Sequence, residues 1–314
     1  MFLICGEALF DFFVEPDQAA GHASMTFKAI AGGSPFNVAV GLSRLSRSSA
    51  LMTGVSDDFL GEKLFDVLTR EGVNTDYVVR LDAPTTLAMV APGSDGSPRY
   101  AFYGERAADR SLTRAHLPVL SDEVEGIHLG SYSLVVDPTA DTLLDLVAHA
   151  GEQRLISLDP NIRLAIEPSV ERWQQQVSAF ASYANMIKLS DEDVHLLYPE
   201  REIEDVARSF LSKRCGLVIV TQGGDGAVAY THDHAPVSVP ITPLDVVDAV
   251  GAGDTFQAAL LCWLSEQRLS TPAGVSGLVP EQIRAMMVFA HRAAAVTCQR
   301  RGPDLPHRSD VADA

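Results

Sequence analysis

The sequence predicts an α/β fold built around a mostly parallel sheet. Short, continuous apolar runs recur along the chain, and most are followed by a stretch whose apolar residues have helical spacing. Strands without polar alternation are typical of a sheet covered on both faces, and a helix after each strand is the connection that parallel strands need. A length of 314 residues with 46% hydrophobic content is enough for one large domain.

The individual elements follow from these runs and from the turn residues between them. The predicted strands are Phe2–Cys5, Ala50–Thr53, Gly126–Leu129, Leu155–Leu158, Met186–Leu189 and Leu217–Thr221. The predicted helices include Asn37–Arg47, Gly61–Glu71, Thr139–Gly151, Val170–Tyr183, Asp191–Leu197, Ile203–Lys213, Thr255–Gln267 and Pro280–Gln299. In such folds ligands bind beyond the carboxyl ends of the strands. The residues expected to gather at that rim, because each follows a predicted strand or begins a helix, are Asp11, Asn161, Ser190, Gly223 and Asp254.

Composition excludes several classes of partner. The net charge of −17 argues against binding to nucleic acid or to an acidic membrane, because both need a basic face. Four widely separated cysteines in apolar surroundings indicate buried thiols in a reducing compartment rather than disulfides or a zinc site. The start of the chain has no basic region and only a short apolar run, so it is interpreted as a core strand and not as a signal peptide. We therefore expect a cytoplasmic protein.

The most informative motif lies between Asp248 and Phe256. Gly251, Ala252 and Gly253 stand directly before Asp254, and an apolar helical run follows. Small residues let backbone N–H groups approach an anion closely, and the helix N-terminus adds partial positive charge. A carboxylate at this place suits a base that takes a proton from a hydroxyl as the hydroxyl attacks a phosphate. The alternative is a glycine-rich turn in which Asp254 only caps the helix.

A second glycine cluster lies upstream, where Gly32 and Gly33 precede a predicted helix that carries Asn37. Together the two clusters resemble the paired signatures of the ribokinase-like (pfkB) sugar kinase family. Further motifs occur in the family's order and cover nearly the whole chain: Gly6–Asp11, Gly54–Gly61, Asp159–Arg163 and Thr221–Gly226. The resemblance implies a ribokinase-like three-layer sandwich, a single kinase domain over 1–314, and a small β-sheet lid formed by segments 12–31 and 85–103. A lid over the site would exclude water and so prevent wasteful hydrolysis of ATP.

The resemblance also implies roles for individual residues. The sugar would be bound by Asp11, Gly32, Gly33, Asn37 and Arg110, although Arg110 could instead pair with Asp109 at the surface. Asp254 would be the catalytic base, and the amides of Gly251, Ala252 and Gly253 would face the transferred phosphate. The ATP-binding positions would be Asn161, Arg163, Lys188, Ser190, Thr221, Gly223 and Gly226. For Arg163 and Lys188 the alternative is an ordinary surface charge.

Metal ions are expected to assist phosphoryl transfer. Mg²⁺ would bridge phosphate oxygens and be held mostly through water. Three departures from the family pattern bear on this. Ala249 replaces the usual threonine, Ser190 and Asp193 replace an Asn-x-x-Glu motif, and the segment around Arg301–Pro303 matches poorly. Asp193 is a candidate to hold Mg²⁺ through water, and Asp248 is a candidate ligand for a monovalent cation such as K⁺, whose requirement is left open.

The substrate expectation rests on resemblance to bacterial fructokinases in Gly6–Asp11, in Phe102–Arg110 and around Lys188. It implies ATP-dependent phosphorylation of a primary hydroxyl, with D-fructose giving fructose 6-phosphate. The alternatives are a 2-keto-3-deoxygluconate kinase, a ribokinase, or a non-catalytic sensor that binds sugar or nucleotide. A homodimer formed through the lid is a further expectation, which the sequence alone does not decide.

Overall fold

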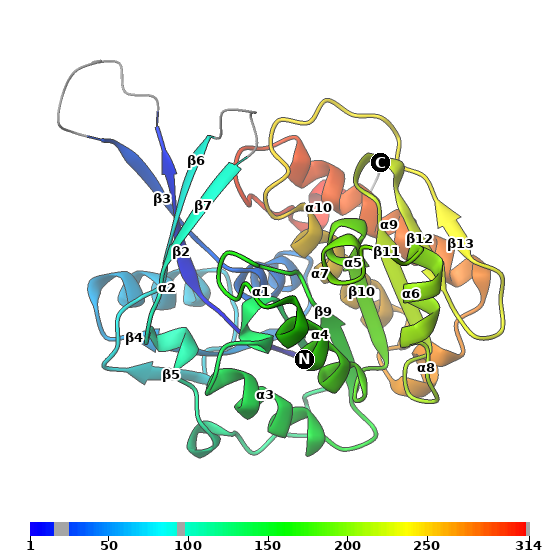
Figure 1. The fold of residues 1–314 in the computed structure, drawn as a ribbon, viewed down its shortest axis with the longest axis horizontal. Helices are drawn as coiled ribbons and strands as arrows, with labels where there is room; N and C mark the ends of the chain where they lie inside the picture. Colours follow the sequence, from blue (N-terminus) through cyan, green and yellow to red (C-terminus); the bar gives the residue numbers. More distant parts are fainter. Residues whose placement is uncertain (16–24, 93–97, 312–314) are drawn as a thin grey trace.

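The computed structural model describes residues 1–15, 25–92 and 98–311. Within them the central sheet has nine strands (Figure 1). Their order from one edge to the other is β13 (Val237–Val239), β12 (Ala227–Tyr230), β11 (Leu217–Thr221), β10 (Met186–Ser190), β9 (Leu155–Asp159), β8 (Gly126–Gly130), β1 (Phe2–Cys5), β4 (Ser49–Ser56) and β5 (Val78–Leu81). The pairs from β5 through β11 are parallel, and β12 and β13 are antiparallel additions at one edge. The predicted mostly parallel sheet is confirmed.

Helices cover both faces of this sheet, which gives three layers. One face packs against α1 (Ser34–Arg44), α2 (Phe59–Arg70), α7 (Ala252–Glu266) and α9 (Pro280–Cys298). The other face packs against α3 (Thr139–Ala148), α4 (Val170–Ala181), α5 (Asp191–Leu197) and α6 (Ile203–Phe210). The short helices α8 (Pro272–Ser276) and α10 (Arg308–Val311) complete the C-terminal half. Because the sheet is covered on both sides, its strands read as unbroken apolar runs.

A separate, smaller sheet projects from the main body beside α1 and α2 (Figure 1). Its strands, in spatial order, are β3 (Phe27–Gly32), β2 (Leu9–Val14), β6 (Leu87–Pro92) and β7 (Pro98–Tyr103). Most residues of these strands lie in the two predicted lid segments, 12–31 and 85–103, although β2 already begins at Leu9 and β3 ends at Gly32. Parts of those segments, 16–24 and 93–97, lie outside the described residues.

The element boundaries differ from the predicted ones at the two helices that matter most. The helix predicted from Asn37 begins at Ser34, because Pro35 stands in its first turn, where a missing N–H costs nothing. The helix predicted from Thr255 begins at Ala252, so Asp254 lies inside its first turn. Asp11 was expected beyond the first strand of the main sheet, but it lies within β2 of the small sheet. It therefore reaches the rim from a different layer.

No helix among the described residues has both the length and the apolar character that a bilayer crossing would need.

Candidate functional site

The first turns of α1 and α7 meet at a buried carboxylate. Ser34 donates from Oγ to Oδ1 of Asp254 at 2.7 Å, and Asn37 donates from Nδ2 to Oδ2 at 2.8 Å. Asp254 is only 8% exposed. Burial raises the pKa of Asp254, while the bonds from Asn37 and Ser34 and the charges of Lys188 and Arg163 oppose that shift. A carboxylate held in this way has a fixed direction and is more basic than an exposed one.

The turn before Asp254 has the geometry of an anion-binding site. Gly251 has φ 81°, a left-handed conformation that favours glycine, and a Cβ there would lie 2.9 Å from the Cβ of Pro303. Backbone N–H groups in the first turn of a helix have no acceptor within that helix. A Cβ on Gly253 would lie 3.3 Å from Nζ of Lys188, so the lysine ammonium lies against this turn. Backbone N–H groups and a cation thus converge beside Asp254.

Lys188 reaches this turn from β10 and is held by a buried ion pair. Its Nζ donates to Oδ2 of Asp159, on β9, at 2.9 Å, and both side chains are buried. Burial lowers the pKa of Lys188. The carboxylates of Asp159, Asp193 and Asp254 together raise it by more than burial lowers it, so the net shift is upward. Burial also raises the pKa of Asp159, to about 6, against the opposing charge of Lys188. The ammonium is therefore charged near neutral pH and one oxygen of Asp159 anchors it.

The small sheet brings Asp11 to the same place. A Cβ on Gly32 would lie 2.6 Å from Oδ2 of Asp11 and 4.0 Å from Oδ1 of Asn37, so the glycine permits a close approach of all three. Burial raises the pKa of Asp11 to about 7; the charge of Arg163 lowers it and that of Asp254 raises it. Asn37, which lies beside Gly32 with Asp11, also binds Asp254, so Asp11 and Asp254 belong to one site. Four of the predicted residues thus converge around Asp254: Asp11, Gly32, Asn37 and Lys188.

Arg110 lies deeper at the base of the small sheet. Its Cζ is 4.8 Å from the centre of the Tyr132 ring, and a Cβ on Gly104 would lie 2.7 Å from its Nη2. Asp109 is buried and accepts hydrogen bonds of 2.6 Å from Thr86 Oγ1 and from the Tyr132 hydroxyl. The expected alternative, a surface pair between Arg110 and Asp109, is therefore not what the described residues form.

The residues predicted to bind ATP follow three neighbouring strands. Asn161 has φ 43°, an uncommon conformation for a residue other than glycine, and it begins the loop after β9 that contains Arg163. Arg163 donates from Nη1 to the carbonyl of Ile162 at 2.9 Å. Ser190 caps α5 by accepting from the backbone N–H of Asp193 at 3.0 Å. These residues line the carboxyl-end rim, as expected for this fold.

The third of these strands, β11, ends at Thr221 and a glycine-rich turn. A Cβ on Gly223 would meet no atom within 4 Å, so this glycine borders open space. Gly226 has φ 103°, and a Cβ there would lie 2.2 Å from the carbonyl oxygen of Val239. Gly226 therefore shapes the turn, while Gly223 leaves room above it.

The two candidate metal residues both hold backbone groups. Asp193 accepts from the N–H of Ile162 at 2.7 Å and from the N–H of Ser190 at 3.0 Å. Asp248 accepts from the N–H of Val250 at 3.0 Å and of Gly302 at 2.8 Å. In the part of the chain that the structure describes, no three His, Cys, Asp or Glu side chains lie close enough to hold a metal ion by themselves. A metal at this site would need further ligands, such as phosphate oxygens or water.

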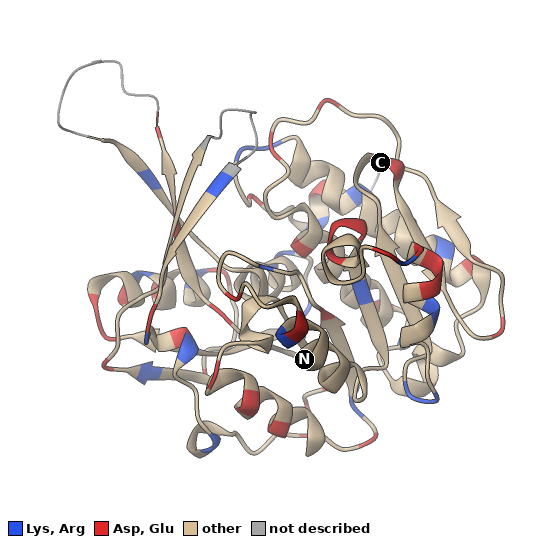
Figure 2. Cartoon of the chain, in the orientation of Figure 1, with Lys and Arg blue, Asp and Glu red and all other residues tan. Residues whose placement is uncertain are grey.

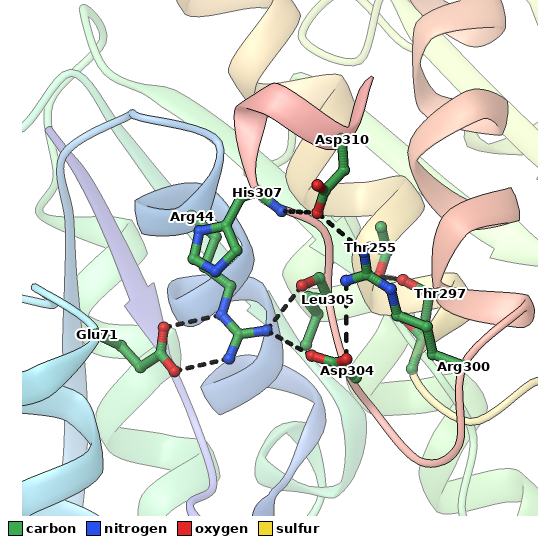
Figure 3. A network of polar contacts seen from close by, with 10 residues as sticks. Arg44, Glu71, Thr255, Thr297, Arg300, Asp304, Leu305, His307 and Asp310 are labelled. Carbon is green, nitrogen blue, oxygen red and sulfur yellow. Dashed lines mark hydrogen bonds and ion pairs between the residues drawn. The ribbon is translucent and has the colours of Figure 1, made fainter. Parts of the chain in front are cut away.

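The C-terminal segment is joined to α1 by a network of polar contacts (Figure 3), and its Pro303 lies against the Gly251 turn. Arg44, at the end of α1, binds both oxygens of Glu71 at 2.7 and 2.8 Å and donates to the carbonyl of Leu305 at 2.7 Å. Asp304 accepts from Arg44 at 3.0 Å. Thr255 and Thr297 join α7 to α9 through a 2.8 Å hydrogen bond. We call residues 302–305 the C-terminal latch, because they connect α1 to the loop that precedes Asp254.

Sequence reasoning gave no role to Ser34 and Asp159, which bind Asp254 and Lys188 in the structure. Ser34 stands between the glycine pair and the first turn of α1, a position that a helix-start analysis could have selected. Asp159 belongs to the Asp159–Arg163 motif but was given no role of its own.

A cavity of about 520 Å³ lies at the opposite end of the sheet. It is lined by Glu125, Arg154 and Ser270, among others, and includes none of the predicted site residues.

In the view of Figure 2, lysines and arginines are interspersed with aspartates and glutamates along the ribbon. The positive charge available to an anion at this site comes from two nearby side chains, Lys188 and Arg163. A buried carboxylate, a helix N-terminus with free N–H groups and an anchored lysine together suit an enzyme that moves a phosphoryl group.

Comparison with known proteins agrees with this geometry. Residues 2–309 match the pfkB family carbohydrate kinases. The chain is 36% identical over 90% of its length to a fructokinase of Rhizobium leguminosarum bv. trifolii, of which 86% is covered. It is 33% identical over its whole length to a protein of Arabidopsis thaliana named "Probable fructokinase-6, chloroplastic", of which 82% is covered. The crystal structure of a fructokinase with bound ATP from Xylella fastidiosa has a TM-score of 0.87, with 28% identity, covering 99% of this chain and 96% of that one. The chain belongs to the pfkB family of carbohydrate kinases.

Proposed function

We propose that this kinase transfers the γ-phosphoryl group of ATP to the primary hydroxyl of D-fructose, giving fructose 6-phosphate and ADP. The observation that carries the proposal is the position of Asp254, fixed by Ser34 and Asn37 beside the Gly251–Gly253 turn and Lys188. The fructose assignment is supported by the relatives named fructokinase.

In the proposed reaction Asp254 accepts the proton of the hydroxyl. The oxygen then forms a bond to the γ-phosphorus, the bond from that phosphorus to the bridging oxygen breaks, and ADP leaves with the electron pair. The backbone N–H groups of the turn stabilise the charge that develops on the phosphoryl oxygens. Lys188 adds a positive charge from below, and its anchor on Asp159 keeps it in place.

The sugar would lie between the small sheet and α1. Asp11 and Asn37 would bridge ring hydroxyls, with the backbone of Gly32 and Gly33 beneath them, and Arg110 would contribute from the base of the small sheet. This assignment is supported by the close approach of Asp11 to Gly32 and Asn37. The small sheet would act as the lid of a single kinase domain over 1–314.

ATP would lie along the rim formed by the ends of β9, β10 and β11. We assign its contacts to Asn161, Arg163, Lys188, Ser190, Thr221, Gly223 and Gly226, supported by the open space above Gly223. Asp193 would hold Mg²⁺ through water, and the ion would offset the negative charge of the phosphates. K⁺ at Asp248 is a further expectation, supported by the position of this carboxylate, which accepts hydrogen bonds from the N–H groups of Val250 and Gly302 in the loops before α7 and after α9.

Two broader expectations belong to this proposal. We expect the protein to act in the cytoplasm, which its four free cysteines support. We also expect a homodimer in which the small sheets of two copies meet, since an exposed sheet edge favours pairing.

A coupled assay of ADP formation with fructose, ribose and 2-keto-3-deoxygluconate tests the proposal. We expect the highest kcat/KM for fructose. A higher value for either alternative sugar would overturn the substrate, and no ADP formation with any sugar would favour a non-catalytic sensor.

A further inference from the structure

Strand β7 of the small sheet carries two tyrosines that face opposite sides. In the strand register, Phe102 lies across from Ala88 and Tyr100 lies across from Val90. On the other side of β6, Ala88 lies across from Asp11. Because residues directly opposite each other in neighbouring strands point to the same face, Tyr100 and Phe102 share the face of Asp11. Tyr103, one residue beyond Phe102, points to the other face.

Tyr100, the tyrosine on the face of Asp11, belongs to a row of aromatic rings. The rings of Tyr100 and Phe102 stack with centroids 6.0 Å apart and planes 11° apart. Phe102 in turn meets the ring of Tyr132, in the main body, edge-on at 6.4 Å. The row therefore runs from the main body outward along the small sheet, and Tyr100 is its outer member.

Tyr100 lies where the sugar-side and phosphate-side residues meet. Burial raises the pKa of its hydroxyl. The negative charges of Asp11 and Asp248 raise this pKa further, and the positive charge of Arg163 lowers it. The group is thus within electrostatic reach of residues from β2, from the loop after β9 and from the loop before α7. Yet 42% of the side chain is exposed among the described residues, so part of the ring is open to a ligand.

We propose that Tyr100 is a specificity-determining residue whose ring covers the sugar held at Asp11. The proposal rests on the proposed function, because it places the sugar beside Asp11. An aromatic ring offers a large, rigid apolar surface to the C–H face of a sugar, and its hydroxyl supplies a hydrogen bond at the edge. Covering the sugar also keeps water from the phosphoryl group.

The test compares three variants in the coupled ADP assay: Tyr100→Ala, Tyr100→Phe and Tyr103→Ala. Tyr103 is a matched control, because it is the same residue type on the same strand and is 64% exposed on the opposite face. We expect Tyr100→Ala to raise the KM for fructose about tenfold, with the KM for ATP changed less than about twofold. Tyr100→Phe, which keeps the ring, should change the KM for fructose by about threefold or less. Tyr103→Ala should leave both constants within about twofold of the wild type.

A second readout separates covering from simple loss of structure. ADP formation in the absence of sugar should rise in Tyr100→Ala relative to its rate with sugar, and the Tm should stay near that of Tyr103→Ala. Equal KM values for the two alanine variants, or an effect on the KM for ATP alone, would overturn the role of Tyr100. A wild-type chain that forms no ADP with any sugar would overturn both this role and the proposed function.

Discussion

Asn37 donates from Nδ2 to Oδ2 of Asp254 at 2.8 Å, although 217 positions separate the two residues in the sequence. The bond joins the first turns of α1 and α7, so the proposed base and one side of the proposed sugar site are positioned together. It also acts on the chemistry, because it lowers the pKa of Asp254 against the effect of burial.

Removal of this bond should change the pH dependence of the reaction. In Asn37→Ala the carboxylate loses a donor, so its pKa rises and the acidic limb of kcat against pH moves to higher pH. We expect the variant to lose several-fold more activity at pH 6 than at pH 8, relative to the wild type. An acidic limb unchanged in position would show that Asn37 does not control the ionisation of Asp254.

The buried pair of Lys188 and Asp159 predicts a separation of stability from activity. Lys188→Met should lower kcat about a hundredfold or more, because it removes charge from the phosphate site. It should also destabilise the fold by about 3 kcal/mol, since Asp159 is left buried without its partner.

The double variant Lys188→Met with Asp159→Asn serves as the control. It should regain most of the stability in denaturant unfolding while staying inactive. If restored stability brought restored turnover, Lys188 would have a structural role only.

Glu7 predicts an unusual dependence of stability on pH. Its carboxyl is fully buried beneath Gly33, where burial raises its pKa to about 7 from 4.5. Because folding raises this pKa, the stability that it confers is complete below about pH 4.5 and is lost as the pH rises through 7. The change amounts to about 3 kcal/mol at most.

Glu7→Gln should therefore match the wild type near pH 5 and become relatively more stable towards pH 9, measured by denaturant unfolding. The exposed Glu171→Gln gives the control, with no such trend. A difference between Glu7→Gln and the wild type that stays constant from pH 5 to 9 would contradict the assignment.

The C-terminal latch should support both the fold and the active-site turn. Arg44→Ala breaks the paired bonds to Glu71 and the bond to Leu305, and we expect a loss of about 1–3 kcal/mol in the free energy of unfolding. It should also lower kcat several-fold, because Pro303 of the latch packs on Gly251.

The exposed pair of Arg70 and Asp66 provides a matched comparison for the latch. Arg70→Ala should cost less than about 0.5 kcal/mol and leave kcat unchanged. Equal effects of the two arginine variants would argue against any connection between the latch and the site.

Much of the fold could be predicted because its strands are continuous apolar runs. Leu155–Asp159 and Leu217–Thr221 were located to within one residue, since a fully buried parallel strand has no polar interruption. The edge strands β12 and β13 were missed because they are short, and Val237–Val239 carries one exposed residue among its three. Helix starts were predicted late where Gly and Pro hid the first turn, as at Ser34 and Ala252.

Site residues could be predicted where they belong to a sequence motif. Residues brought to the site only by tertiary packing could not be predicted. Gly251–Asp254 could be assigned because small residues before a carboxylate are an unusual local pattern. Gln257 was not noticed, yet it is fully buried and donates to Ser157 Oγ at 2.9 Å, which joins α7 to β9 one turn beyond Asp254. A single glutamine within an apolar helical run is the signal that could have identified it.

Replacement of Asp254 by asparagine tests the central claim most directly. The change keeps the shape of the side chain and removes the base, so a steady-state assay should show kcat reduced about a hundredfold or more. Calorimetry should show only a modest change in the affinity for fructose. Turnover equal to that of the wild type would contradict the account, because no other group in it accepts the proton.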